Sequence, residues 1–316
     1  FGRLSLASNT TGVSNCAFGH ATLDAGNNSY NSAFGSEALT NCTESNNSAF
    51  GFRALKQNTT GQDGVAFGVN ALRDNTTGIR NVAVGKDAMI TNTTGANNVA
   101  VGYLALTANT TASYNNAFGD NAMIYNTTGA GNAAFGAYCL HDNTTGHSNT
   151  AVGGYSPSTG GSNVVAALRN NTTGSYNVAV GTGALATNTT TSQLTAVGYK
   201  AMYANTGGTN NSAFGHLALT ANTTGFENTA IGRQTLEDCT DGDRNTACGS
   251  IALTTCTTGS LNSGFGREAL RDLTTGSYNT GLGRSAGEQM TTGDNNCFIG
   301  NDSGRAGQPG GAVTTG

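Results

Sequence analysis

The sequence is poor in tryptophan, proline and charge: among 316 residues it has no Trp, two Pro and 10% charged side chains. A typical globular chain is about 25% charged. Disorder is not expected, because 36% of the residues are hydrophobic and the net charge is only −4, whereas disordered chains combine few apolar residues with high net charge. Neutral Asn, Thr, Ser, Gly and Ala fill much of the remainder, a composition typical of extracellular proteins.

No run of Lys and Arg occurs, so the electrostatic footprint of a nucleic-acid-binding protein is missing and nucleic acid is not an expected partner. No apolar stretch approaches the roughly 20 residues that cross a bilayer, and we expect no membrane span in this segment. A signal peptide is also missing. Since the chain starts at Phe1-Gly2 in mid-repeat, we expect it to be a piece of a longer protein.

Catalytic patterns are missing too. The four histidines are scattered, and no Ser/His/Asp order, carboxylate pair, phosphate-binding loop or metal-ligand spacing stands out from the repeat. The chain also lacks the inserted loops with which some solenoids build a carbohydrate-active site. We therefore expect a non-enzymatic protein without cofactor or metal.

A short block, Asn-x-Ala-hydrophobic-Gly, recurs with a period of 17 residues, apart from two steps of 16 near the start and one gap of 28. We interpret the gap as two contracted units of 14 residues, Asn149 to Asn163 and Asn163 to Asn177. The closing glycines are Gly19, Gly35, Gly51, Gly68, Gly85, Gly102, Gly119, Gly136, Gly153, Gly181, Gly198, Gly215, Gly232, Gly249, Gly266, Gly283 and Gly300.

Each repeat, for example Asn81 to Asn97, holds two apolar blocks too short for helices, separated by Gly and by the turn Asn-Thr-Thr-Gly. This pattern predicts an all-β fold, a parallel β-solenoid (β-roll) with about 17 residues in each coil. The array covers residues 1–316, with an irregular contracted segment at 153–177 and an irregular end at 301–316. Pro157 and Pro309 fall in those two segments, as expected if nearly every backbone N–H donates to the next coil.

The two faces of the repeating strand differ. Large apolar residues such as Phe18, Phe118 and Phe135 alternate with Ala, and no charged residue occurs in the block. We expect the large residues to fill the coil and Ala to face a neighbouring chain, with a symmetric trimer as the preferred assembly. The alternative is that Ala packs inside a very thin coil.

The Asn that opens each block indicates an amide ladder along the stack, and Asn also tolerates the left-handed conformation of a tight corner. It stands at Asn15, Asn31, Asn47, Asn81, Asn98, Asn115, Asn132, Asn149, Asn163, Asn177, Asn211, Asn228, Asn245, Asn262, Asn279 and Asn296.

The Asn-Thr-Thr motif has two interpretations. It satisfies the N-glycosylation pattern, and it is also a turn that Asn caps and Gly closes. The candidate glycosylation sites are Asn9, Asn58, Asn75, Asn92, Asn109, Asn126, Asn143, Asn171, Asn188 and Asn222. Ice binding by the stacked Thr is a third idea, disfavoured because adjacent Thr side chains point to opposite sides of a strand.

Seven cysteines form no CxxC pair, and their odd number excludes full intrachain pairing. Cys239 and Cys256 lie one repeat apart at the same position, within disulfide range if coils stack at about 4.8 Å. They are the one disulfide candidate, and buried thiols account for most of the others.

Charged neighbours such as Arg73-Asp74, Lys86-Asp87 and Arg271-Asp272 flank the second apolar block. They predict a solvated outer strip that resists aggregation. A functional charged groove is the alternative.

The block, as Asn-Ser-Ala-Phe-Gly at Asn31 to Gly35 or Asn-Thr-Ala-Ile-Gly at Asn228 to Gly232, resembles the head repeat of trimeric autotransporter adhesins. The longer unit with Asn-Thr-Thr-Gly is similar to repeats of tail-fibre-like proteins. The resemblance covers essentially the whole chain and implies a left-handed parallel β-roll, a homotrimer and a surface or virion fibre. Most coils are longer than those of adhesin heads, and we recognise neither a chaperone domain nor a membrane anchor within this segment.

We expect an extracellular structural fibre or filament, located at a cell surface, in a filament or on a virion. The alternative is a receptor-binding phage tail fibre or adhesin head. Self-association, as a homotrimer or end to end, is the expected partnership, and cell-surface glycans or receptors are further candidate partners. Neither end resembles a cap, which favours a longer parent chain or end-to-end polymerisation.

Overall fold

The computed structural model describes residues 1–155 and 165–305. Within them the protein is a parallel β-solenoid of about 16 turns with about 17 residues in each, and none of these residues is helical. The predicted all-β solenoid is therefore confirmed. The chain divides into two compact units, Phe1–Asn149 (unit 1) and Thr150–Gly316 (unit 2), which are described separately below.

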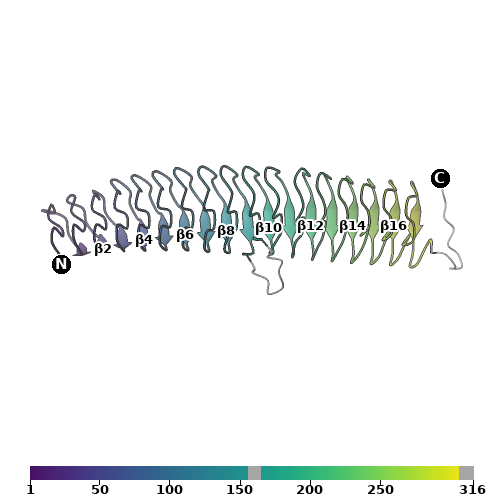
Figure 1. Ribbon diagram of the computed structural model, residues 1–316, viewed down its shortest axis with the longest axis horizontal. Helices are drawn as coiled ribbons and strands as arrows, with labels where there is room; N and C mark the ends of the chain where they lie inside the picture. Colours follow the sequence, from purple (N-terminus) through teal and green to yellow (C-terminus); the bar gives the residue numbers. More distant parts are fainter. Residues whose placement is uncertain (156–164, 306–316) are drawn as a thin grey trace. The chain divides into compact units, whose positions relative to one another are not determined.

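Each described coil contributes one strand of three residues, and neighbouring strands pair in parallel with equivalent repeat positions opposite each other, such as Ala83 and Ala100 (Figure 1). Unit 1 contains β1 (Cys16–Phe18), β2 (Ser32–Phe34), β3 (Ser48–Phe50), β4 (Val65–Phe67), β5 (Val82–Val84), β6 (Val99–Val101), β7 (Asn116–Phe118) and β8 (Ala133–Phe135). Unit 2 contains β9 (Thr150–Val152), β10 (Val178–Val180), β11 (Thr195–Val197), β12 (Ser212–Phe214), β13 (Thr229–Ile231), β14 (Thr246–Cys248), β15 (Ser263–Phe265), β16 (Thr280–Leu282) and β17 (Cys297–Ile299).

Most of each coil is not strand, and its backbone alternates in handedness. In one coil of unit 1, Asp87, Met89 and Asn97 have φ of 57°, 48° and 57°. Left-handed backbone costs an L-residue about 1–2 kcal/mol. Their amides compensate by donating to carbonyls of neighbouring coils, from Asp87 to Val69 (2.9 Å), from Met89 to Ala105 (3.0 Å) and from Asn97 to Ile79 (3.0 Å).

This backbone restricts which residues the repeat can use. A β-branched residue at positive φ is a genuine outlier, and among the non-glycine residues with positive φ in the described ranges only Ile251 is β-branched. The restriction explains why the large core position is Leu or Met, as at Leu106 (φ 54°) and Met123 (φ 52°), although Val and Ile are common in strands.

Alanine, not phenylalanine, points into the coil. Ala83 and Ala100 are 0% exposed, as are Met89 and Leu106 of the second apolar block. A methyl group built on Gly264 or Gly281, which replace this Ala in unit 2, would lie 3.3 Å and 2.9 Å from a preceding Leu side chain. The Leu therefore packs against the strand and leaves room for little more than a Cβ. The expectation that Phe18, Phe118 and Phe135 fill the core was wrong, and the thin-coil alternative holds.

The block glycines allow the closest approach between coils. Gly85 has φ 139°, and a Cβ on it would lie 2.3 Å from the carbonyl oxygen of Gly102. Only glycine satisfies both the dihedral angle and the contact, which accounts for its recurrence at this position.

The interpretation of the 28-residue gap as two contracted coils was wrong. In unit 2, β9 pairs directly with β10, with Thr150 opposite Val178. The amide of Ala167 also donates to the carbonyl of Gly153 (2.9 Å). In other coils the equivalent hydrogen bond, which closes the corner after the block glycine, joins residues three positions apart. The segment is thus one coil with an insertion. Part of it, with Pro157 and Asn163, lies outside the described residues, as does Pro309; the described ranges contain no proline.

The core changes composition at β17. Phe298 takes the inward position of Ala and is 4% exposed. Glycine replaces the large residue of the second block at Gly287 and Gly304, where an added Cβ would lie 2.5 Å and 2.4 Å from the Phe298 ring. One aromatic ring thus fills the space that Ala and Leu share in other coils.

We expect Leu106→Ile to destabilise unit 1 by roughly 1–3 kcal/mol, because it places a β-branched residue at φ 54°. The matched variant Leu106→Met, compatible with that backbone, should cost less than about 1.5 kcal/mol. Chemical denaturation compares the two. Equal losses for Ile and Met would contradict the backbone explanation.

We expect Gly85→Ala to cost roughly 3 kcal/mol or more, since the methyl group meets a backbone carbonyl at a φ closed to L-residues. Gly131→Ala is the control: its φ is 69° and the nearest atom to a Cβ is 3.8 Å away, so the loss should be about 1 kcal/mol. Similar denaturation midpoints for the two variants would be inconsistent with this account.

Candidate interaction surface

The residues on either side of the inward Ala point outward. We call the first and third residues of the strands the outer sheet face. In β5 and β6 these residues are Val82, Val84, Val99 and Val101, all half-buried around a fully buried Ala. Since each strand is only three residues long, this face is two side chains wide and repeats once in every coil.

The outer sheet face carries no charge in any described strand. Its third-residue column is strongly apolar: Phe18, Phe34, Phe50, Phe67, Val84, Val101, Phe118 and Phe135 in unit 1, and Val152, Val180, Val197, Phe214, Ile231, Cys248, Phe265, Leu282 and Ile299 in unit 2. Many of these side chains are substantially exposed, for example 57% at Phe67 and 44% at Ile231. The first-residue column is mostly Ser, Thr and Val, so hydroxyl groups lie beside the apolar column.

Aromatic rings stack along this column in unit 1. The ring centroids of Phe18 and Phe34 are 4.9 Å apart, those of Phe34 and Phe50 are 4.7 Å apart, and those of Phe118 and Phe135 are 5.0 Å apart. The planes are within 12° of parallel in these pairs. Stacking covers one ring face with the next, while the outer edges of the rings stay accessible.

Two adjacent ladders of Asn line the interior, and the side chains of Asn81 and Asn92, one from each ladder, donate to the same carbonyl, that of Gly95. At the block-opening position the side-chain oxygen Oδ1 of Asn81 accepts the backbone amide of Asn98 (3.0 Å), and the side-chain nitrogen Nδ2 of Asn81 donates to the backbone carbonyl of Gly95 (2.7 Å). The expected ladder at this position is therefore present, built from both backbone and side-chain partners. In unit 2 the same bond joins the amide of Asn228 to Asn211 (2.8 Å).

The second ladder, which sequence reasoning missed, is formed by the Asn of Asn-Thr-Thr. Asn109 donates to the Asn92 side-chain oxygen (2.7 Å) and to the carbonyl of Ala112 (3.1 Å), and Asn222 donates to Asn205 (2.7 Å) and Gly225 (3.1 Å). The second bond of each pair caps the turn. The signal was the Asn-to-Gly spacing of three residues, which was interpreted only as a surface turn.

The candidate glycosylation sites lie in this ladder. Asn9 is half-buried, whereas Asn58, Asn75, Asn92, Asn109, Asn126, Asn143, Asn171, Asn188 and Asn222 are buried. The geometry supports the turn interpretation of the motif, because a glycan on a buried amide nitrogen would require its ladder bonds to break. Glycosylation itself stays a prediction.

Cys239 and Cys256 occupy the ladder position on neighbouring coils of unit 2. Their thiols donate to the carbonyls of Gly242 (3.6 Å) and Gly259 (3.4 Å), the bond that Asn makes elsewhere. A hydrogen bond with Cys256 and burial raise the pKa of the Cys239 thiol. Both are free thiols in this structure, and the disulfide stays a prediction.

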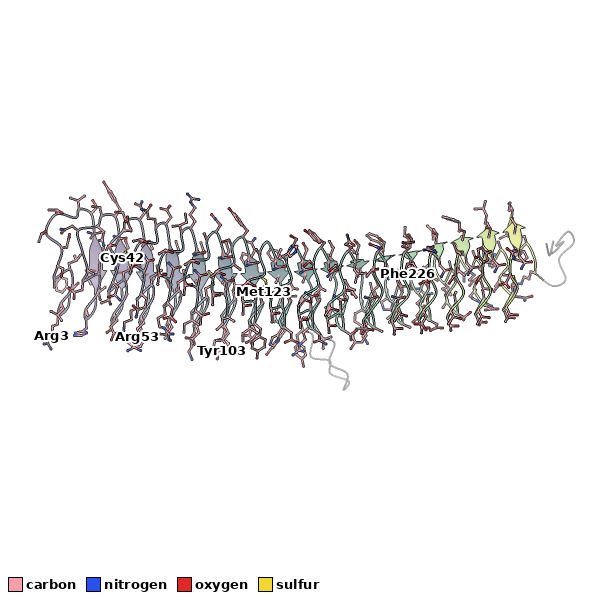
Figure 2. The ribbon with its side chains drawn as sticks, turned by 90° about the horizontal axis from the view of Figure 1, so that it is seen from above. Arg3, Cys42, Arg53, Tyr103, Met123 and Phe226 are labelled. Atoms are coloured by element: carbon pink, nitrogen blue, oxygen red, sulfur yellow. The ribbon has the colours of Figure 1, made fainter. Side chains whose placement is uncertain are left out.

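The charged residues form ion pairs at the edges of the coil, as expected for a solvated strip. Arg73 pairs with Asp74 (2.6 Å), and Arg53 pairs with Glu37 of the preceding coil (3.0 Å). The Arg53 and Lys56 partners hold the pKa of Glu37 below its usual value, with Lys56 the stronger. Arg3, Arg53 and Tyr103 project from the same edge of unit 1 (Figure 2).

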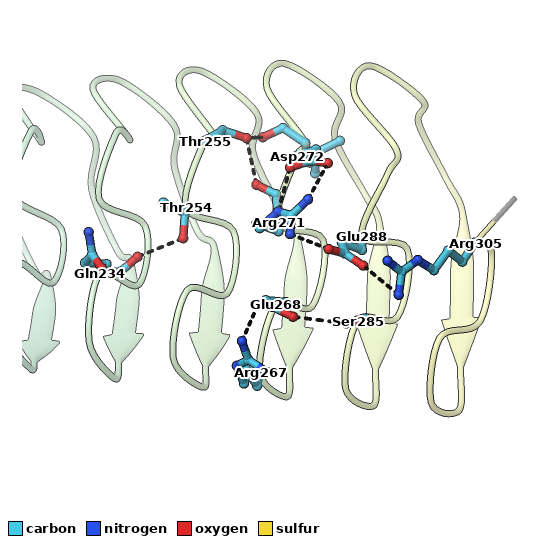
Figure 3. A network of polar contacts seen from close by, with 11 residues as sticks. Gln234, Thr254, Thr255, Arg267, Glu268, Arg271, Asp272, Ser285, Glu288 and Arg305 are labelled. Carbon is cyan, nitrogen blue, oxygen red and sulfur yellow. Dashed lines mark hydrogen bonds and ion pairs between the residues drawn. The ribbon is translucent and has the colours of Figure 1, made fainter.

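In unit 2, Glu288 is almost buried between Arg271 and Arg305, which come from the coils on either side (Figure 3). Arg271 also binds Asp272, with Nε 2.8 Å from Oδ1. These contacts tie three successive coils together beside the Phe298 ring.

Within residues 1–155 and 165–305 no group of three His, Cys, Asp or Glu side chains is arranged to hold a metal ion, and no helix there could cross a membrane. The geometry leaves an uncharged and partly exposed apolar face along the strands. No protein-family model matches the chain, and no curated protein matches it either.

We expect Phe118→Ala to destabilise a dilute, unassembled chain by only about 1–2 kcal/mol, because the lost ring is 36% exposed and chiefly stacks on Phe135. Leu106→Ala, which empties a fully buried position, should cost about 2–5 kcal/mol. Chemical denaturation ranks the two variants. A larger loss for Phe118→Ala than for Leu106→Ala would contradict the outward position of Phe.

Proposed function

We propose that the protein is a non-enzymatic, extracellular structural fibre that assembles laterally from copies of the same chain through the outer sheet face. The observation that supports this proposal is the uncharged, half-exposed apolar column that repeats in every coil of each unit. Soluble monomers rarely expose a contiguous apolar patch of more than a few hundred Å². Burial of this column against a partner would gain roughly 25 cal/mol per Å².

A second copy of the chain is the partner that fits this face best. The side chains of the column repeat with the coil spacing, about 4.8 Å, and a partner must match that period over many coils. An identical chain has the same coil spacing and therefore matches this period along its length. The Ser and Thr hydroxyls of the first column, for example Ser32 and Ser48, would add hydrogen bonds beside the apolar contacts.

A closed, symmetric assembly with its rotation axis along the stacking direction would bring equivalent residues of all copies to the same height. Three copies are our preferred number, on the strength of the resemblance of the repeat to adhesin heads. The assembly would use the Phe and Val side chains and not, as first expected from the sequence, the Ala side chains.

The same resemblance supports a second candidate function, a receptor-binding tail fibre or adhesin head. Electron microscopy of the native source material separates the two candidates. Long filaments support the structural fibre, whereas discrete rods on virions or cell surfaces support the receptor-binding protein.

The lateral assembly is tested by adding charge to the outer sheet face. We expect the wild-type chain, of 31.7 kDa, to sediment at about three times this mass, and Val101→Lys/Phe118→Lys to sediment as a single chain, because burying a charge without a partner is costly. The control, Thr94→Lys/Thr111→Lys, adds the same charge at exposed turn positions and should keep the wild-type mass.

Two results would overturn the lateral assembly. One is a wild-type chain that is monomeric at micromolar concentration. The other is a Val101→Lys/Phe118→Lys variant that keeps the wild-type mass. Circular dichroism of all three proteins establishes that a change in mass does not come from unfolding.

A further inference from the structure

A second surface of unit 2 lies outside the outer sheet face, at the corner that follows each block glycine. The corner residues stack on one another: the carbonyl of His216 accepts the amide of Gln234 (2.9 Å), and that of Arg284 accepts the amide of Asp302 (2.9 Å). We call the residues that directly follow the block glycines, together with Lys200 from the next position of the corner, the corner strip: Thr182, Tyr199, Lys200, His216, Arg233, Ser250, Arg267, Arg284 and Asn301.

No residue that directly follows a block glycine of unit 2 is acidic, although the whole chain has a net charge of −4; the next position, which supplies Lys200, also holds Glu268 and Asp302. Two carboxylates stand next to it, and each is already bound. Arg267 pairs with Glu268 (2.6 Å), which also accepts a hydrogen bond from Ser285 (3.3 Å; Figure 3), and Arg305 pairs with Asp302 (3.2 Å).

Three cations of the strip remain available. Among the described residues, Lys200, Arg233 and Arg284 make no ion pair within the chain. Arg233 and Arg284 are exposed, and the guanidinium of Arg233 donates a hydrogen bond to the neutral side-chain oxygen of Gln234. Their positive charge is therefore directed to solvent, not used to hold the coils together.

Aromatic rings lie beside Lys200 in the corner strip. The Tyr199 ring is 39% exposed and stacks on the His216 ring, with centroids 5.3 Å apart and planes 17° from parallel. The Lys200 ammonium lies 5.6 Å from the Tyr199 centroid and 5.3 Å from that of Tyr203. A ring held by its neighbours can receive the C–H face of a sugar at little entropic cost.

We propose that the corner strip binds a linear acidic polysaccharide that runs along the stacking direction of unit 2. Its carboxylate or sulfate groups would contact Lys200, Arg233 and Arg284, and one sugar ring would lie on Tyr199. The polymer is linear because the strip is one residue wide and several coils long.

The spacing of the cations favours a polysaccharide over a nucleic acid. Lys200 and Arg233 are two coils apart, and Arg233 and Arg284 are three coils apart, so the charges stand roughly 10 and 14 Å from each other at about 4.8 Å per coil. A nucleic-acid strand carries a phosphate about every 3.4 Å, and most phosphates would find no cation here. Acidic polysaccharides separate their charges by whole sugar units.

The binding test uses the full chain and fluorescently labelled polymers at low ionic strength: alginate for carboxylates, dextran sulfate for sulfates, and neutral dextran. We expect at least one acidic polymer to bind, and neutral dextran not to bind. Lys200→Gln/Arg233→Gln/Arg284→Gln should weaken that binding about tenfold or more. The control, Arg3→Gln/Arg80→Gln/Lys86→Gln, removes the same charge from unit 1 and should change binding less than about twofold.

Equal losses for the two triple variants would overturn the proposal, since binding would then follow net charge and not the strip. Absence of binding to both acidic polymers would also overturn it, and so would binding of single-stranded oligo-dT as tight as that of the better acidic polymer. The sedimenting mass of each variant is measured alongside, so failure here stays distinguishable from failure of lateral assembly.

Discussion

The structure depends on hydrogen bonds between coils, because no coil can form a stable unit alone. A coil contributes one strand of three residues and a core little larger than one Ala and one Leu or Met, so its own apolar burial is small. It also holds three residues in the left-handed region, which is unfavourable. Neighbouring coils compensate for both, since the amides of those residues find acceptors one coil away.

Stacking also explains why the repeat is so strict. Each residue contacts the equivalent residue of the next coil, so the residue type at each repeat position is restricted by the stack of equivalent residues, or column, to which it belongs. The block Gly approaches the carbonyl of the next block Gly, the core Leu meets Ala of the strand, and two columns of Asn link their amides along the interior. Where Ala and Leu or Met fill the coil, the interior is too thin for the Phe side chains of the third strand position, which lie on the outside. Lateral assembly, as we propose it, is the consequence of that exclusion.

The repeat length, the parallel solenoid and the block-opening ladder follow from the sequence, because each is a property of one column. The sidedness of the strand did not follow, since alternation of Phe and Ala is compatible with either face pointing inward. The large core position lies in the second block, where Leu and Met occur and β-branched residues do not. That restriction comes from the positive φ of this position, which a hydrophobicity pattern does not reveal. The equal spacing of Asn149, Asn163 and Asn177 suggested two short coils, whereas the pairing of β9 with β10 leaves room for none between them.

The outer sheet face itself could be located only after the direction of Ala was known. Its lack of charge was evident in the sequence, but an uncharged strand is equally compatible with burial within its own chain. The corner strip was hidden for a different reason: its members are separated by 17 residues along the chain and come together only when the coils stack.

Cryo-electron microscopy of the purified protein, at a resolution that separates the coils, tests the account most directly. The account predicts bundles of parallel solenoids with a rise of about 4.8 Å per coil, in which the Phe and Val columns of the copies face one another and Ala lies inside each coil. Single solenoids with those columns free in solvent, or bundles joined through the turns or the corner strip, would contradict it.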